Sequence, residues 1–352
     1  MTGEELSGVT SRNVEANGHR IHLLEAGSGP MVLMLHGFPE IAYSWRHQIA
    51  ALAEAGYHAV AIDMLGYGRS SKPDTVETRI TEQIRTLVGV VAALGHETAA
   101  VVGHDVGSPV AWSAAWTCPE VFDAVVGVSV PFGGRGLFAW PGDSFGAVRP
   151  SEYEAEIAGP GKIHYQEYFA QPGALAREVE KDMRGWLNGL YYGTSAAAPL
   201  PRFSEIADQD AALAFLRETA IVMVPGEGFA DKLPTPGEDH WISAEELDVF
   251  VASFERTGIE AALNSYRTMD LDWELLGPYA DRPIDVPALF IAGEKDLPAL
   301  WGVDAIARMR EVAPQAHAPA ILEGCGHWNA QEDPALFNRT LLEFLAAAKP
   351  AG

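Results

Sequence analysis

The chain has few residues that could cross-link a small secreted fold or bind a metal through sulfur. Only Cys118 and Cys325 are cysteines among its 352 residues. This excludes a disulfide framework and a cysteine cluster for a metal. Residues 1–17 include three glutamates and no apolar segment, so they do not read as a secretory signal. We therefore expect a reducing, cytoplasmic location.

Long apolar runs and positive charge are also scarce. No segment is apolar over the roughly 20 residues that a membrane-spanning helix needs. Lys and Arg number 24 against 48 Asp and Glu, which gives a formal net charge of −24. Such a chain repels nucleic-acid phosphates and anionic membrane surfaces, so we expect neither a nucleic-acid partner nor membrane insertion. The acidic residues are spread along the chain, which predicts a solvated surface and says little about the substrate.

Short β-type runs alternate with helical patterns, first before residue 130 and again near the C-terminus. This alternation is typical of a parallel sheet with crossover helices, and predicts an α/β fold. The expected strands are residues 31–35, 58–62, 99–102, 124–129, 288–291 and 320–322, and the expected helices are residues 45–55, 81–94, 107–117, 303–312 and 334–347.

The region between these two parts is aromatic and irregular, with Pro and Gly clusters around residues 141–160 and 224–240. Such a break predicts an inserted, mainly helical domain. We expect this domain to span residues 135–280, and the core to consist of residues 1–134 and 281–352. No pattern places residues 195–241, which would suit a lid, a dimer contact or a mobile loop.

The most informative residue is Asp105, in Gly103-His104-Asp105-Val106-Gly107-Ser108, directly after an expected strand. Small residues on both sides allow a tight strand-turn-helix that projects the central side chain above the strand ends. A carboxylate attacking an acyl group would form an unstable mixed anhydride, whereas attack on a saturated carbon forms an ordinary ester. The position therefore favours covalent opening of a C–O or C–halogen bond. The alternative is a plain helix N-cap.

Two further loops follow expected strands and supply an acid and a base. His327 lies in residues 324–328 after the last strand, and Asp296 follows strand 288–291, with Glu294 as its rival. The chain order nucleophile, acid, base matches that of α/β hydrolases. Aspartate is already ionised at neutral pH, so we expect His327 to activate the water that hydrolyses the ester, with Asp296 stabilising the imidazolium.

The loop of residues 36–40 follows the strand at 31–35, where hydrolases of this plan place an oxyanion donor. We predict the backbone amides of Phe38 and Val106 as the two donors. His36 lies beside a glycine at a strand end, which favours a structural role. Pro39 is a candidate for a cis proline.

The leaving group separates the candidate reactions. Opening an epoxide creates an alkoxide that needs a proton, whereas a departing halide needs only N–H dipoles. Tyr165 and Tyr266 lie in the inserted region, and a phenol can hydrogen-bond an epoxide oxygen and protonate it. Aromatic residues in a helical insertion are more often packing residues, so the pattern alone leaves both roles open.

Together these residues resemble the α/β-hydrolase-fold epoxide hydrolases, the soluble and microbial group with a helical cap. The likeness covers nearly the whole chain and rests on residues 36–40, 43–48, 63–71, 103–108 and 324–328. It implies a mostly parallel eight-stranded sheet with helices on both faces, a hydrophobic epoxide and water as substrates, and no cofactor. It also implies that Tyr165 and Tyr266 polarise the epoxide, with Tyr168, Tyr191 and Tyr192 as alternatives.

One residue departs from that family. Val106 stands where epoxide hydrolases and haloalkane dehalogenases commonly carry Trp after the nucleophile. We expect Phe38, Val106 and Trp328 to line the substrate pocket, and Val106 to leave a wider space beside Asp105.

The rival functions are less well supported. A haloalkane dehalogenase usually holds halide with that Trp and with Asn at the position of Phe38, and a fluoroacetate-type enzyme carries Arg after the nucleophile. No G-x-S-x-G surrounds a serine, and Ser129 ends a different strand, which disfavours an esterase. A ligand receptor on a hydrolase fold is the alternative of another class, because fold alone does not determine function. The sequence does not determine the oligomeric state, and a homo-oligomer is one of the alternatives.

Overall fold

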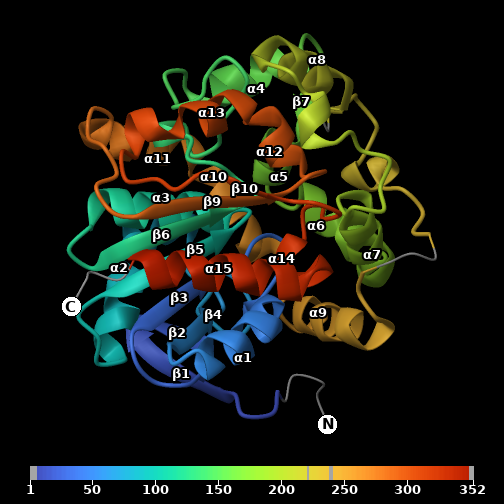
Figure 1. Cartoon of the computed structure of the whole chain (residues 1–352). Coiled ribbons are helices and arrows are strands. Elements are labelled where there is room, and N and C mark those ends of the chain that lie inside the picture. The colour runs from blue at the N-terminus through green and yellow to red at the C-terminus, as the bar shows by residue number, and fades with distance from the viewer. Residues whose placement is uncertain (1–5, 220–221, 238–240, 349–352) are drawn as a thin grey trace.

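The computed structural model describes residues 6–219, 222–237 and 241–348, and its centre is an eight-stranded sheet (Figure 1). The strand order is β1-β2-β4-β3-β5-β6-β9-β10. The strands are β1 (Thr10–Ala16), β2 (His19–Ala26), β3 (Met31–Leu35), β4 (His58–Ile62), β5 (Ala99–His104), β6 (Phe122–Val128), β9 (Ala288–Gly293) and β10 (Ala320–Leu322). The pairs β1–β2 and β2–β4 are antiparallel and all the others are parallel, so the expected mostly parallel sheet is confirmed.

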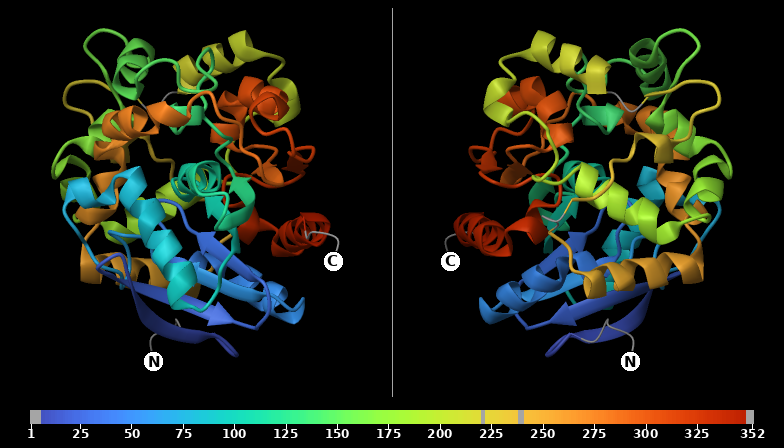
Figure 2. Two further views of the ribbon diagram at one scale, coloured as in Figure 1. Left: turned by 90° about the vertical axis from the view of Figure 1, so that its left-hand side faces the viewer. Right: turned by 90° about the vertical axis from the view of Figure 1, so that its right-hand side faces the viewer.

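Helices cover both faces of this sheet. Successive side chains of a strand point to opposite faces, so the fully buried strand β3 serves two cores. Val32 and Met34 belong to one apolar cluster and Leu33 and Leu35 to the other. Figure 2 shows α15 and the pair α2 and α3 on different sides of the strands. The core helices are η1 (Ala42–Trp45), α1 (Arg46–Glu54), η2 (Thr75–Thr78), α2 (Ile80–Ala93), α3 (Gly107–Thr117), α12 (Leu297–Trp301), α13 (Val303–Val312), α14 (Asn329–Glu332) and α15 (Pro334–Ala348).

A largely helical region is inserted between β6 and β9, and it runs from the top of Figure 1 to its right side. It contains η3 (Gly134–Gly136), α4 (Pro150–Ala158), β7 (Ile163–His164), α5 (Tyr165–Ala170), α6 (Ala174–Val179), α7 (Met183–Gly193), η4 (Phe203–Glu205), α8 (Gln209–Thr219), β8 (Val222–Met223), η5 (Phe229–Lys232), α9 (Ala244–Thr257), η6 (Glu260–Leu263), α10 (Asn264–Arg267), α11 (Met269–Leu276) and η7 (Gly277–Tyr279). We propose residues 135–280 as this cap, on a core of residues 1–134 and 281–352.

Two parts of the chain differ from what the sequence predicted. Strands β1 and β2 were not expected. Edge strand β1 exposes most of its side chains and therefore lacks an apolar pattern, whereas β2 is buried over its central four residues. The segment 195–241, which no pattern placed, forms η4, α8, β8 and η5, and β8 pairs antiparallel with β7. Residues 220–221 and 238–240 of that segment lie outside the described ranges.

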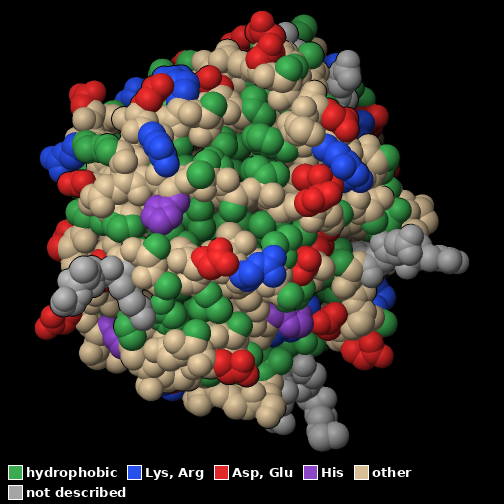
Figure 3. Space-filling view, viewed as in Figure 1, with side chains coloured by type: hydrophobic (Ala, Val, Ile, Leu, Met, Phe, Trp, Pro, Cys, Tyr) green, Lys and Arg blue, Asp and Glu red, His purple; other side chains and the backbone are tan. Residues whose placement is uncertain are grey.

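The acidic excess is dispersed over the surface. On the face shown in Figure 3, Asp and Glu side chains are scattered, and several adjoin Lys or Arg. None of the described helices is both long enough and apolar enough to cross a membrane.

Candidate active site

Asp105 sits in the tight turn between β5 and α3 with a φ of 50°, a left-handed conformation that strains a residue with a Cβ. The positions of the neighbouring glycines have no room for a side chain. A Cβ on Gly103 would lie 2.1 Å from the carbonyl oxygen of Gly107, and a Cβ on Gly107 would lie 2.5 Å from that of His36. The turn thereby holds the Asp105 carboxylate beyond the carboxyl end of β5, as the residue pattern predicted.

His327 connects two carboxylates from different strand ends. Its Nε2 lies 3.6 Å from Asp105 Oδ2, and its Nδ1 lies 2.9 Å from Oδ1 of Asp296, whose side chain is fully buried. Glu294 instead accepts a hydrogen bond from the Gly324 amide at 3.1 Å. An imidazole that donates Nδ1–H to Asp296 presents Nε2 to Asp105 as a proton acceptor. The geometry therefore favours Asp296 over Glu294 as the orienting acid.

Ser129 is a site residue that sequence reasoning missed. Its Oγ lies 2.9 Å from Asp296 Oδ1 and 2.7 Å from His327 Nδ1. The residue directly follows β6, which lies between β5 and β9 in the sheet. Since the carboxyl ends of neighbouring parallel strands meet at one edge, this position was the available signal.

The loop after β3 supplies a backbone donor to the Asp105 carboxylate. The Phe38 amide donates to Asp105 Oδ1 at 2.8 Å, and the Phe38–Pro39 peptide bond is cis. In the part of the chain that the structure describes, the Val106 amide makes no hydrogen bond to this carboxylate, so its role as the second donor stays a prediction.

His36 is held by backbone groups on both ring nitrogens. Its Nδ1 donates to the Gly37 carbonyl at 2.7 Å, and its Nε2 accepts from the Met64 amide at 3.0 Å. Complete burial lowers the pKa of His36 and keeps the ring neutral, as these two bonds require. The residue therefore acts as a structural support of the loop.

A buried ion pair lies next to the loop that carries His327. His104 Nδ1 donates to Glu40 Oε2 at 2.7 Å, and His104 Nε2 donates to the backbone oxygen of His327 at 2.9 Å. Burial opposes both charges. The Glu40 carboxylate nevertheless raises the pKa of His104 to about 9, and the His104 cation lowers the pKa of Glu40 to about 2. We infer that the pair is ionised at neutral pH and fixes the loop that carries His327.

Replacing His104 by glutamine is expected to destabilise the protein mainly below pH 9. The folded-state pKa of His104 is raised from 6.5 to about 9, so its contribution is complete below pH 6.5 and is lost as the pH rises through 9. The contribution of Glu40 to stability is complete above pH 4.5 and is lost as the pH falls towards 2. Urea unfolding at pH 6 and pH 10 should show the gap between wild type and variant shrinking by about 3 kcal/mol. An equal gap at both values would contradict an ionised pair.

A mostly apolar pocket of about 70 Å³ opens above Asp105 and His327. Its walls include Phe38 and Trp328, as expected, together with Phe169, Leu190, Phe229, Leu297 and Trp301. The Trp328 ring meets the His327 ring edge-on at 4.6 Å, and its Nε1 donates to the Tyr191 carbonyl at 2.9 Å. Such a lining suits a small hydrophobic ligand and restricts water at the carboxylate.

Two tyrosines line this pocket with Asp105, namely Tyr165 from α5 and Tyr266 from α10. Burial and the Asp105 charge raise the pKa of both phenols well above 10, so both remain protonated donors. The alternatives are placed differently. Tyr168 Oη donates to Glu178, Tyr191 Oη donates to the Pro39 carbonyl at 2.7 Å, and Tyr192 does not line the pocket.

Val106 is not where its sequence position suggested. It lines a separate cavity of about 20 Å³, which it shares with Tyr266 and Met269, and it is not among the residues that line the pocket of Asp105. The structure therefore places Val106 on the wall of a neighbouring cavity, and the expected widening beside Asp105 stays a prediction.

Among the described residues, no group of side chains could hold a metal ion.

The comparisons with a protein family and with individual relatives agree with one another. Residues 30–145 match the α/β hydrolase fold family. The chain is 42% identical to epoxide hydrolase B of Mycobacterium tuberculosis over 96% of its own length and 99% of the relative's. It is 39% identical to epoxide hydrolase A of the same organism, over 96% and 97%.

Solved structures agree. An epoxide hydrolase from an endophytic Streptomyces superposes with a TM-score of 0.86 at 43% identity, covering 97% of this chain and 96% of that one. Epoxide hydrolase A from Mycobacterium thermoresistibile superposes with a TM-score of 0.83 at 38% identity, covering 97% and 99%. The expected α/β-hydrolase fold with its inserted cap is thereby confirmed.

Proposed function

This chain belongs to the epoxide hydrolases of the α/β-hydrolase fold, and from that premise we propose that it converts an epoxide to a vicinal diol through a covalent ester on Asp105. One observation carries the proposal. The carboxylate that contacts His327 opens into the same pocket as two protonated phenols, so nucleophile, base and acids surround one small space. That combination matches the needs of epoxide opening followed by ester hydrolysis.

In the first step, Asp105 Oδ2 attacks one epoxide carbon. The Phe38 amide binds the other oxygen, Oδ1, which leaves Oδ2 as the attacking atom. As the new C–O bond forms, the epoxide C–O bond breaks and its electron pair goes to the epoxide oxygen. Tyr165 and Tyr266 hydrogen-bond this oxygen, and one of them protonates it. The product of the step is a hydroxyalkyl ester.

In the second step, His327 Nε2 takes a proton from water, which attacks Cγ of Asp105. Charge then develops on Oδ1, where the Phe38 amide already lies at 2.8 Å, and we assign the Val106 amide as the second donor. Asp296 stabilises the imidazolium. When the bond between Cγ and Oδ2 breaks, the imidazolium proton passes to Oδ2, and the diol leaves with that oxygen. The second water proton, left on the Asp105 carboxyl group, restores the phenol that gave up its proton in the first step.

The substrate class follows from the pocket walls. Aromatic and aliphatic side chains such as Phe169, Phe229 and Trp301 surround a volume of about 70 Å³. We therefore propose small hydrophobic aryl or alkyl epoxides as substrates.

A single turnover of styrene oxide in ¹⁸O-labelled water, with enzyme in excess, tests the covalent route. The water oxygen should remain on Asp105, because the diol departs with the original Oδ2. Mass spectrometry of the peptide that contains Asp105 should show one added label. Label in the diol and none in the peptide would show direct attack by water and exclude the ester.

A further inference from the structure

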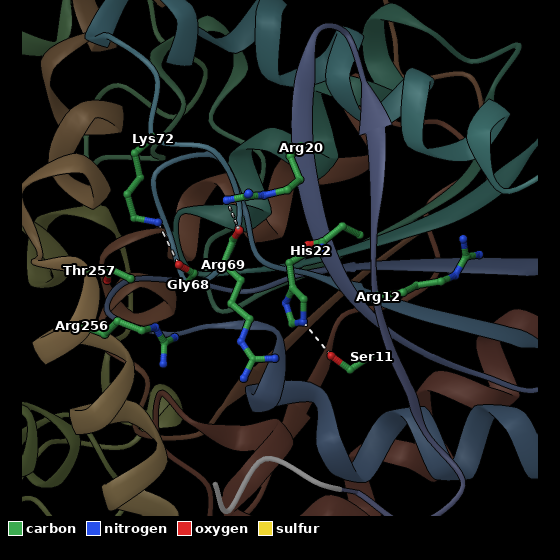
Figure 4. A pocket seen from close by; sticks show the side chains of 10 residues that line it. Ser11, Arg12, Arg20, His22, Gly68, Arg69, Lys72, Arg256 and Thr257 are labelled. Atoms are coloured by element: carbon green, nitrogen blue, oxygen red, sulfur yellow. Dashed lines mark hydrogen bonds between the residues drawn. The ribbon is translucent and has the colours of Figure 1, made fainter.

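A large polar pocket lies apart from the catalytic residues, between the hairpin of β1 and β2, the loop after β4 and the end of α9 (Figure 4). Its volume is about 550 Å³. Six basic side chains line it, namely Arg12, Arg20, His22, Arg69, Lys72 and Arg256, and the other lining residues are polar or glycine. It therefore differs in chemistry from the apolar epoxide pocket.

Two of these basic side chains are paired with carboxylates of the fold. His22 Nδ1 lies 2.8 Å from Asp63 Oδ2, and Arg12 Nε lies 2.5 Å from Glu25 Oε1. In Figure 4 the Arg12 guanidinium points away from the other cations. The Arg12 guanidinium and the His22 ring are therefore engaged within the protein.

Three others are held by neutral groups. Arg20 donates to the Arg69 carbonyl at 3.3 Å, Lys72 Nζ to the Gly68 carbonyl at 2.8 Å, and Arg256 to Ser253 Oγ at 3.4 Å. Across the described ranges of the chain, no carboxylate lies within ion-pair distance of Arg20, Lys72 or Arg256. Their positive charges are therefore not cancelled by direct partners.

These cations are close enough to repel one another. Partial burial lowers the pKa of Lys72, and the charges of Arg256 and Arg20 lower it further, whereas Asp63 opposes the effect. Figure 4 shows the guanidinium groups of Arg69 and Arg256 directed into the same space. Apart from Arg12, which pairs with Glu25, four of the chain's 24 Lys and Arg residues line this one pocket of a protein whose net charge is −24. A local positive potential of this kind attracts an anion.

We propose that this pocket binds a small soluble phosphorylated molecule, with Arg20, Lys72 and Arg256 as its principal ligands. Three cations without a carboxylate partner among the described residues match a group of two or more negative charges, and guanidinium forks pair with phosphate oxygens. The proposal does not depend on the epoxide reaction.

Binding would link the core to the inserted region. Arg256 and Thr257 end α9 of the inserted region, whereas Arg20 and Lys72 belong to the core. Tyr67, in the same loop as Lys72, donates from Oη to the Ala262 carbonyl at 3.0 Å. An anion held by both sides should therefore raise the melting temperature of the whole protein.

Isothermal titration of the full chain with inorganic pyrophosphate, at constant ionic strength, tests the site. We expect saturable binding of one pyrophosphate per chain. Lys72→Gln and Arg256→Gln should each weaken it by about tenfold or more, as expected for loss of a charge-assisted hydrogen bond. The control is Arg339→Gln on α15, which removes the same charge from an exposed side chain outside the pocket and should leave the affinity unchanged.

Three results would overturn the proposal. The first is no saturable heat at millimolar pyrophosphate, and the second is an equal loss of affinity in Arg339→Gln. The third is sedimentation of the protein with phosphatidylglycerol vesicles in the absence of pyrophosphate binding, which would assign the pocket to a membrane surface. Thermal unfolding by circular dichroism checks that each variant is folded. If Arg256→Gln does not fold, Lys72→Gln, whose side chain is exposed, provides the comparison.

Discussion

The His327→Gln variant is expected to accumulate the ester on Asp105 and to release almost no diol. The proposed nucleophile needs no base, because a carboxylate attacks carbon without giving up a proton. Water does need one, and His327 Nε2 lies 3.6 Å from Asp105 Oδ2, where the attacking water must sit. Loss of a general base lowers a rate by roughly 10²- to 10⁴-fold, so hydrolysis should become far slower than alkylation. Intact-protein mass spectrometry should show one added substrate mass.

The matched control is His19→Gln, which changes a histidine at the start of β2, far along the sheet order from β10. It should turn over like wild type and carry no adduct. Peptide mapping should place the adduct of His327→Gln on the peptide that contains Asp105. An adduct on another peptide, or undiminished diol release without an adduct, would refute the assigned roles.

Removing both pocket phenols is expected to abolish alkylation, whereas removing one should only slow it. Tyr165 and Tyr266 line the same pocket, and either hydroxyl can donate to the epoxide oxygen. Single Phe variants should therefore form the ester about 10- to 100-fold more slowly. The double variant leaves the alkoxide without an acid and should lose about 10³-fold or more. The rate of adduct formation in the His327→Gln background measures this step separately from hydrolysis.

Tyr168→Phe is the matched control, because its hydroxyl donates to Glu178 and it does not line the pocket. It should form the ester at the wild-type rate. The pKa of each pocket phenol is held well above 10, so alkylation should not decline through phenol ionisation up to pH 10. A double variant within about threefold of the parent rate would exclude the tyrosines as acids.

Much of the core could be predicted because its signals are local. The apolar runs at residues 31–35 and 58–62 coincide with β3 and β4, and the pattern at 107–117 coincides with α3. Strands buried on both faces read as continuous apolar segments, which needs no knowledge of distant residues. Strand β1 gave no such signal, because a mostly exposed edge strand has little apolar pattern to detect.

The elbow of Asp105 was determined partly by local contacts. The close approach of Gly103 is to Gly107 in the same turn, so this need for a small residue is written in the motif itself, whereas the close approach of Gly107 is to His36 after the distant strand β3. The order Asp105, Asp296, His327 was readable for a related reason. Parallel strands bring their carboxyl ends to one edge, so residues after different strands can be expected to meet there.

Other features depended on the direction of side chains and on contacts between distant segments, and only the tertiary structure decided these. Asp296 and Glu294 are two residues apart, yet one contacts His327 and the other the Gly324 amide. Val106 follows Asp105 directly, yet it lines a separate cavity that it shares with Tyr266 and Met269 and does not line the pocket of Asp105.

The polar pocket is the clearest case of a feature invisible in the sequence. Arg20, Lys72 and Arg256 lie far apart in the sequence, and no motif relates them. Local patterns report which residues are buried and where the chain turns, because those energies act over a few neighbours. Which charges face one another depends on how strands and helices pack. The sequence therefore determined at which edge of the sheet the proposed catalytic residues lie, and the fold determined which side chains meet there.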